Sequence, residues 1–188
     1  GVFLLYLHKK KSTMIDFFWF RRDLRLDDNA GLYHALKSGK NVQPIFIFDK
    51  NILSKLSDKK DARVSFIYNT IKNINGELNK LGSSLWVYYG DPLSVWKKLI
   101  KENTINSIFT NRDYEIYAKN RDKSVEDFCN TKDVKFSTYK DHVIFEYSEV
   151  LKKDNTPYLV FTPYERKWLE KLESKKVESK SFYLTSYP

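Results

Sequence analysis

The chain has 188 residues, a length that fits one domain with a sizeable core. Its formal net charge of +9 would suit a polyanionic partner, but the lysines are scattered over the chain, so charge alone is weak evidence for a nucleic-acid-binding protein. The single cysteine, Cys129, excludes an internal disulfide and a multi-cysteine metal site, which fits a reducing cytosol. We therefore expect a cytoplasmic protein without a metal centre.

The first residues, GVFLLYLHKKKST, precede the only methionine, Met14. Their apolar run is too short to span a bilayer, and the charges follow the run instead of preceding it as in a secretory signal. We interpret residues 1–13 as an N-terminal extension ahead of the natural start, and we expect no membrane partner.

The next stretch predicts a strand, a charged loop and a helix. Ile15–Phe20 is almost wholly apolar and bulky, which is typical of a strand buried on both faces of a parallel sheet. A helix should begin near Asp28 or Asn29, since either can cap it, and Gly39 can take the left-handed position after its last turn. Ligands of open parallel sheets bind beyond the carboxyl ends of the strands, so the loop is a candidate site.

That loop is rich in arginine. Arg21, Arg22 and Arg25 are three of only seven arginines among the 33 basic residues. Where lysine is the usual cation, arginine indicates a need for a planar donor group that pairs with carboxylate or phosphate, or stacks on a ring. The alternative is an internal network in which neighbouring aspartates pair with the arginines and fix the loop. The internal network is favoured for Arg25 and Asp28, and ligand binding for Arg21 and Arg22.

Apolar runs and helical periodicity alternate along the rest of the chain. The expected strands are 42–48, 85–89, 107–111 and 134–139, and the expected helices are 61–81, one that starts at Asp91-Pro92, and 116–129. This alternation predicts an α/β fold: a doubly wound, Rossmann-like sheet of about five parallel strands with helices on both faces. Ile15–Phe20 should be central, and Leu85–Tyr89 should lie toward one edge.

The periodicity fades beyond Lys140. We expect an irregular segment up to Pro163 and a short helix at Tyr164–Leu172. Residues 173–188, rich in Lys and Ser, are interpreted as a linker or a truncated C-terminal end. The α/β domain then covers residues 14–172.

Carboxylates follow three of the expected strands. Asp49, Asp91 and Asp113 could surround one bound ligand, or each could cap a helix or turn. Asp91 precedes a proline and is best explained as a helix cap. Asp49 is the best candidate for a ligand contact, because no capping role is evident for it. His34 and His142 have no visible Ser or Cys partner and are best explained as structural residues.

Seven stretches carry a resemblance to a known family. In chain order they are WFRRDLRLDDNAGL (19–32), FIFDKNIL (46–53), DARVSFI (61–67), LGSSLWVYYGDP (81–92), NRDYEIYAKNRD (111–122), DHVIF (141–145) and TPYLVFTPYERKW (156–168). From Met14 to Leu172 the chain resembles the DNA photolyase and cryptochrome family. The resemblance implies the N-terminal α/β domain, which in some members holds an antenna chromophore. A larger C-terminal helical domain holds the catalytic FAD and most DNA contacts.

The resemblance also indicates the type of antenna. Folate-type members have an Asn-Glu pair just after the Tyr-Glu of the fourth-strand loop, where this chain has Ile116 and Tyr117, so a folate is disfavoured. FIFDKNIL and DARV resemble members whose antenna is a flavin or deazaflavin. The cofactor-binding residues that this implies are Arg21, Arg22, Asp23, Phe48, Asp49, Asn51 and Arg63. They combine an aromatic wall for stacking with arginines for a phosphate or acidic tail, although Phe48 is equally well explained as ordinary core.

The function implied for the parent protein is that of a deoxyribodipyrimidine photolyase, a lyase that uses light to repair cyclobutane pyrimidine dimers in DNA. Its partners would be its own C-terminal flavin-binding domain and, through the full-length protein, damaged DNA. This chain stops before the flavin domain, so we expect no catalysis from this chain alone.

Three alternatives stay open. A cryptochrome blue-light photoreceptor domain would show the same resemblance. A nucleotide-binding α/β module, such as an adenylate-forming ligase, would need a phosphate-binding motif after the first strand. The chain has no G-x-G-x-x-G and no P-loop motif. A non-enzymatic interaction module would have no pocket lined by Arg22 and Asp49.

Overall fold

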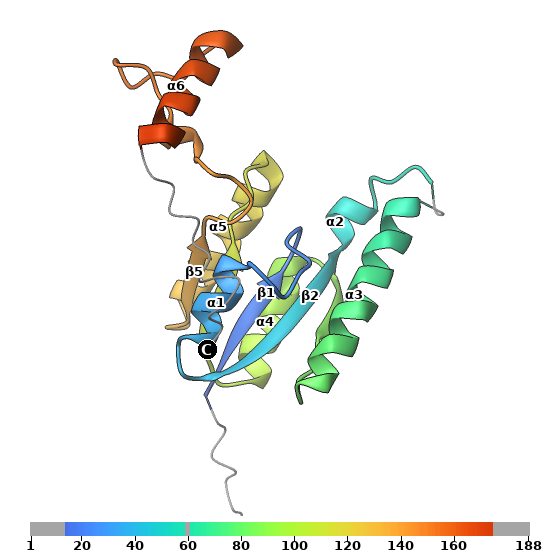
Figure 1. The fold of residues 1–188 in the computed structure, drawn as a ribbon. Coiled ribbons are helices and arrows are strands. Elements are labelled where there is room, and N and C mark those ends of the chain that lie inside the picture. The colour runs from blue at the N-terminus through green and yellow to red at the C-terminus, as the bar shows by residue number, and fades with distance from the viewer. Residues whose placement is uncertain (1–13, 59–60, 175–188) are drawn as a thin grey trace, which may run out of the picture.

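The structure, a computed structural model, describes residues 14–58 and 61–174 (Figure 1). The expected extension over residues 1–13 and nearly all of the expected C-terminal end over 173–188 lie outside these residues. The limits of the domain therefore stay a prediction.

A sheet of five parallel strands forms the centre of the domain. Its strands are β1 (Ile15–Phe20), β2 (Asn41–Asp49), β3 (Trp86–Gly90), β4 (Ile105–Asn111) and β5 (Lys135–Tyr139). They lie in the order β3-β2-β1-β4-β5, so β1 is central and β3 is at one edge. The predicted parallel sheet and the predicted places of its first and third strands are confirmed.

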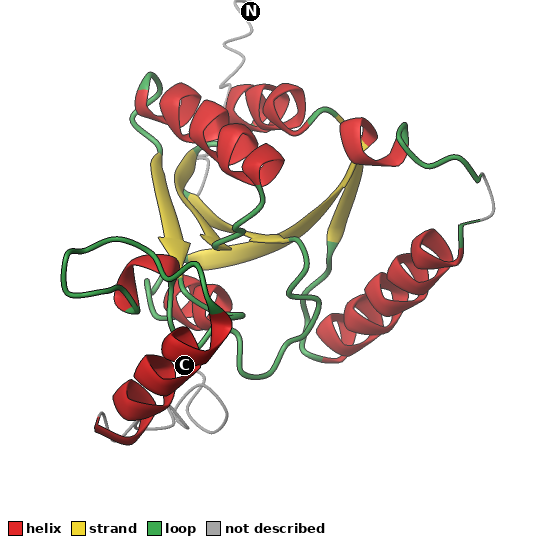
Figure 2. Cartoon of the chain, turned by 90° about the horizontal axis from the view of Figure 1, so that it is seen from above, coloured by secondary structure: helices red, strands yellow, loops and turns green. Residues whose placement is uncertain are grey.

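Helices cover both faces of this sheet, as Figure 2 shows from above. They are α1 (Ala30–Leu36), α2 (Lys50–Leu53), α3 (Ala62–Lys80), α4 (Pro92–Glu102), α5 (Ile116–Asn130) and α6 (Phe161–Ser174), with a 3-10 turn, η1 (Tyr147–Glu149). Side chains of α4 and α5 pack on one face of the sheet, and those of α1 and α3 pack on the other. The doubly wound α/β fold is confirmed.

Strand β1 shows why its sequence is apolar at every position except Asp16. Phe17 and Trp19 pack on the side of α4 and α5, whereas Phe18 and Phe20 pack on the side of α1 and α3. All four side chains are at most 1% exposed. Because both faces are covered, alternation of apolar and polar residues would leave polar groups in the core. Burial of each ring stabilises the fold by about 2 to 3 kcal/mol.

Polar side chains begin the helices that follow the strands. Asn29 and Asp91 each accept a hydrogen bond from the backbone N–H three residues on, at 3.0 Å and 2.9 Å, so both predicted caps are confirmed. Asp49 accepts from the N–H of Asn51 at 2.9 Å and caps α2, a helix of four residues. The expectation that Asp49 has no capping role is therefore wrong, because a helix this short shows no periodicity in the sequence.

The segment after β5 is mostly irregular, as expected, and contains η1. The predicted helix at Tyr164–Leu172 is present as α6, which begins earlier, at Phe161, and ends at Ser174. Figure 1 shows α6 away from the layers of the sheet and its helices. The α/β layers therefore position the candidate site without it.

Candidate functional site

A cleft of about 270 Å³ opens at the carboxyl ends of β1 and β2, next to the first turns of α5. Strands β1, β2 and β3 progress toward one edge of the sheet, and β4 then returns to the other side of β1. Open α/β sheets bind ligands at the place where the strand order reverses in this way. The cleft therefore lies where the sequence predicted a site.

One wall of the cleft is apolar. Phe48 at the end of β2, Ile52 in α2 and Ile67 in α3 line this wall, and the indole of Trp19 lies at the base. Trp19 is 1% exposed, whereas Ile52 is 46% exposed, so the wall runs from the core to the surface. Aromatic and aliphatic surfaces of this kind stack on planar rings.

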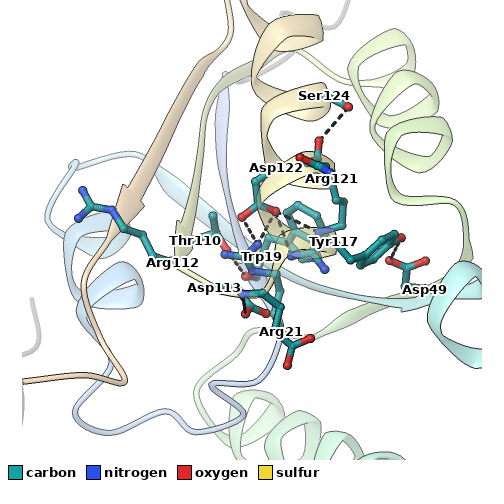
Figure 3. A network of polar contacts seen from close by, with 12 residues as sticks. Trp19, Arg21, Asp49, Thr110, Arg112, Asp113, Tyr117, Arg121, Asp122 and Ser124 are labelled. Carbon is teal, nitrogen blue, oxygen red and sulfur yellow. Dashed lines mark hydrogen bonds and ion pairs between the residues drawn. The ribbon is translucent and has the colours of Figure 1, made fainter. Parts of the chain in front are cut away.

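Two buried arginines flank the indole at the base (Figure 3). The guanidinium carbons of Arg21 and Arg121 lie 5.2 Å and 5.0 Å from the centroid of the Trp19 ring. Both arginines pair with Asp122, and Arg21 also donates to the backbone oxygen of Asn111. Burial lowers the pKa of Arg21, and the charge of Asp122 opposes this shift. The base of the cleft thus holds two cations and one anion in fixed positions.

A hydrogen-bonded chain joins α5 to β2 beside the cleft. The hydroxyl of Tyr117 donates to Oδ2 of Asp49 at 2.7 Å, a contact visible in Figure 3. Nδ2 of Asn51 donates to the same hydroxyl at 3.2 Å and to Oδ1 of Asp91 at 3.1 Å. Burial raises the pKa of Tyr117, and the hydrogen bond to Asp49 raises it further. Tyr117 is therefore a neutral hydroxyl at physiological pH.

Arg22 lies at the mouth of the cleft. Its side chain is 61% exposed, and its Nη1 lies 2.6 Å from Glu115 Oε1 and 3.8 Å from Asp113 Oδ1. An exposed ion pair of this kind contributes at most about 1 kcal/mol. An anionic group of a ligand can therefore compete with Glu115 for this guanidinium.

The structure brings most of the predicted site residues together. Four of the seven line the cleft: Arg21, Arg22, Phe48 and Asp49. Asn51 lies behind the lining, where it donates to Tyr117. Arg63 lies at the surface in the first turn of α3, and its Nη2 is 2.5 Å from Oδ2 of Asp61. The cleft lining therefore does not include Arg63.

Asp23 also points away from the cleft. It is 3% exposed and accepts from the backbone N–H of Arg21 at 2.7 Å. Its Oδ2 accepts from the amide nitrogens of Asn29 at 3.4 Å and Asn111 at 2.6 Å. These contacts tie the loop after β1 to α1 and β4, so the observed role of Asp23 is structural.

Other candidates from the sequence also have structural contacts. Arg25 donates to Oδ2 of Asp141 at 2.9 Å and to the backbone oxygen of Asp28 at 2.6 Å. It therefore fixes the loop, as expected, but its carboxylate partner is Asp141. The ring of His34 stacks on Tyr139 with centroids 4.3 Å apart.

The sequence did not predict Tyr117 and Arg121, which form much of the α5 side of the cleft. They are four residues apart and so share one face of the helix, and that spacing after a strand was the only available signal. Their closeness to Trp19 depends on the pairing of β1 with β4, which local patterns do not specify.

The described residues show no membrane span, no metal site and no reactive thiol beside the cleft. Within 14–58 and 61–174, no helix is long and apolar enough to cross a membrane, and no three His, Cys, Asp or Glu side chains are grouped to hold a metal ion. Burial raises the pKa of the Cys129 thiol to about 11. A thiol of this kind is a poor nucleophile at neutral pH.

The family of the chain follows from its match to known proteins. The sequence model described as DNA photolyase matches residues 17–181. The chain belongs to the DNA photolyase family. This photolyase-family chain spans about a third of the length of the curated relatives that it matches.

Three relatives illustrate the similarity. The deoxyribodipyrimidine photo-lyase of Alkalihalophilus pseudofirmus is 31% identical over 155 residues, covering 80% of this chain and 32% of the relative. Cryptochrome-1 of Aedes aegypti is 28% identical over 147 residues, covering 74% of this chain and 27% of the relative. An archaeal photolyase from Sulfolobus tokodaii, solved with two FAD molecules that imply a novel light-harvesting cofactor, superposes with a TM-score of 0.67 at 30% identity. That match covers 81% of this photolyase-family chain and 34% of the other.

Proposed function

We propose that this chain is the antenna domain of a DNA photolyase and that its cleft binds a flavin-type chromophore. The observation that carries the proposal is the cleft itself, where an aromatic surface formed by Trp19 and Phe48 adjoins two buried guanidinium groups at the carboxyl ends of β1 and β2. When bound, the chromophore would absorb light and pass the excitation to a catalytic flavin elsewhere in the protein.

The residues present fit a planar ring with a polar tail. The volume of about 270 Å³ is just below the range of about 300 to 1,000 Å³ typical of small-molecule pockets, so the cleft suits the ring and leaves the tail at the mouth. Phe48 offers aromatic surface to the ring, and Trp19 closes the base of the cleft. Arg22 can exchange Glu115 for a phosphate or carboxylate of the tail.

Two observations support a flavin or deazaflavin over a folate. The similar photolyase from Sulfolobus tokodaii holds two FAD molecules. The loop after β4 lacks the Asn-Glu pair that the resemblance associates with folate, and Tyr117 in its place is bound to Asp49.

We further propose that the parent protein repairs cyclobutane pyrimidine dimers in DNA with light. In that protein, the catalytic FAD and most DNA contacts would belong to a C-terminal domain, which would be the partner of this one. The short span of the chain relative to its photo-lyase relatives supports this division. A cytoplasmic location is supported by the single cysteine.

A cryptochrome photoreceptor is the second candidate for the parent protein, because cryptochrome-1 of Aedes aegypti matches at 28% identity. The proposed role of the cleft is the same in both cases. The photolyase is preferred because the matching model is described as DNA photolyase and because the photo-lyase of Alkalihalophilus pseudofirmus matches over 80% of this chain, against 74% for the cryptochrome.

Titration of the purified chain with flavin mononucleotide (FMN) tests the proposal through quenching of flavin fluorescence. We expect saturable binding that Arg22→Ala weakens about fivefold, the effect of losing an exposed ion pair to the phosphate. Arg63→Ala is the matched control, because Arg63 lies outside the cleft lining, and it should leave the affinity unchanged. Absence of binding at high micromolar FMN would contradict the proposal.

A further inference from the structure

The carboxylate of Asp49 has unused hydrogen-bonding capacity at the wall of the cleft. It is 7% exposed, and its partners are the N–H of Asn51 at Oδ1 and the hydroxyl of Tyr117 at Oδ2. An ionised carboxylate offers about four acceptor positions, so about two stay open. No Lys or Arg among the described residues lies within ion-pair distance of it.

Other buried carboxylates of the domain are in a different situation. Asp122 pairs with two arginines, and Asp23 accepts from three N–H groups. Asp16 has one oxygen without a hydrogen-bond partner, but it is the second residue of β1 and lies outside the cleft lining. Asp49 thus combines burial, open acceptor positions and a place in the cleft wall. A donor group of a ligand can therefore bind Asp49 without displacing either of its present partners.

The side chains of Tyr117 and Asn51, which surround Asp49, have no O–H or N–H left for a ligand. The one proton of the Tyr117 hydroxyl is directed to Asp49, and the hydroxyl oxygen accepts from Asn51. The amide nitrogen of Asn51 is shared between Tyr117 and Asp91. Asp49 therefore presents acceptors to the cleft and suits a ligand edge that donates N–H. The cationic groups of Lys55 and Arg121 lie 5.4 Å and 6.0 Å from the Tyr117 ring centroid and form no ion pair with Asp49.

We infer that Asp49 is the specificity-determining residue of the cleft and selects planar heteroaromatic rings with an N–H donor edge, such as a cyclic imide. This inference rests on the proposed function and adds the orientation of the ligand: the donor edge points to Asp49, and the anionic tail points to Arg22 at the mouth. Flavin and deazaflavin rings both carry such an imide. A site built to bind an N–H group rejects an analogue that lacks it, because the buried acceptor is then left unpaired.

The test compares FMN with its N3-methyl analogue, in which the imide N–H is replaced. Wild-type protein should bind FMN about 10- to 100-fold more tightly than the analogue, the effect of one charge-assisted hydrogen bond. Asp49→Asn should lower the affinity for FMN to that for the analogue and leave the analogue unchanged. Asparagine has the same shape and still caps α2, so the fold is preserved. Asp154→Asn, at an exposed carboxylate bound to Thr156, is the matched control and should change neither affinity.

The outcomes separate the two claims. Equal binding of FMN and its analogue by the wild type would overturn the inference and leave the proposed function intact. An Asp49→Asn variant that loses affinity for both ligands to the same extent would also overturn the inference, because Asp49 would then act through the shape of the cleft. Absence of binding of either ligand to the wild type would overturn both claims.

Discussion

Two buried aspartates at the carboxyl ends of neighbouring strands have opposite surroundings. Asp23, after β1, is 3% exposed and accepts from three N–H groups that belong to its own loop, α1 and β4. Asp49, at the end of β2, is 7% exposed and accepts from one backbone N–H and the hydroxyl of Tyr117. Asp23 packs against protein on every side, whereas Asp49 lines the cleft.

The difference shows how the charged residues at the carboxyl ends of the strands divide into scaffold and site. On the Asp23 side, the carboxylate is used to hold the loop to α1 and β4. On the Asp49 side, acceptor capacity is left for a ligand. Stability should therefore depend strongly on Asp23 and weakly on Asp49, and ligand affinity should show the reverse order.

Asp23→Ala should have the largest effect on stability. The change leaves the backbone N–H of Arg21 and one amide N–H of Asn111 without their acceptor, whereas the Asn29 amide keeps the backbone oxygens of residues 23 and 25. Unsatisfied buried donors cost about 1 to 3 kcal/mol each, so we expect the free energy of unfolding to fall by about 4 kcal/mol. Urea denaturation measures this loss. A loss below about 1 kcal/mol would show that Asp23 is not part of the scaffold.

Gly31→Ala should have the next largest effect. An added Cβ would lie 2.8 Å from Oδ1 of Asn111 and 2.8 Å from Cε2 of Phe18, with the Thr110 backbone 3.2 Å away. Such overpacking in the scaffold should cost about 2 kcal/mol in urea denaturation. Gly76→Ala in α3, where nothing lies within 4 Å, is the control and should stabilise the protein by about 0.5 to 1 kcal/mol. Equal effects of the two changes would contradict the tight packing at Gly31.

The scaffold was more predictable from the sequence than the site. The apolar run of β1 and the caps Asn29 and Asp91 are local signals, and the structure confirms them. Local sequence patterns could not predict that Asp23 is part of the scaffold and Asp49 part of the site. This difference depends on which side of the loop contacts β4 and on the short helix α2. Tyr117 reaches the cleft only through the order of the strands, and no residue pattern specifies that order.

Tyr117→Phe should have a smaller effect that depends on pH. At neutral pH it removes one donor from Asp49 and should cost about 1 kcal/mol. Burial and the bond to Asp49 raise the pKa of Tyr117 in the folded state above its unfolded value of about 10. The unfolded state thus loses its proton first, so this stabilisation is complete below about pH 10 and is lost as pH rises through the folded pKa. The stability difference between wild type and variant, measured by urea denaturation, should therefore shrink as the pH rises above about 10. A difference that grows with pH would contradict the cause given for the shift.

Asp49→Asn should have the smallest effect on stability. The amide still caps α2 and can donate to the hydroxyl oxygen of Tyr117, so the free energy of unfolding should change by no more than about 0.5 kcal/mol. Thermal and urea denaturation in the absence of ligand measure this change. A loss as large as that of Asp23→Ala would place Asp49 in the scaffold and remove the contrast between the two carboxylates.

The crystal structure of the chain grown with FMN tests the central claim most directly. We predict that the ring lies between Phe48 and the base formed by Trp19, with its imide nitrogen within about 3.2 Å of an Asp49 oxygen and its phosphate beside Arg22. An FMN bound at another surface, or an empty cleft under conditions where FMN binds in solution, would contradict the claim that this cleft is the chromophore site.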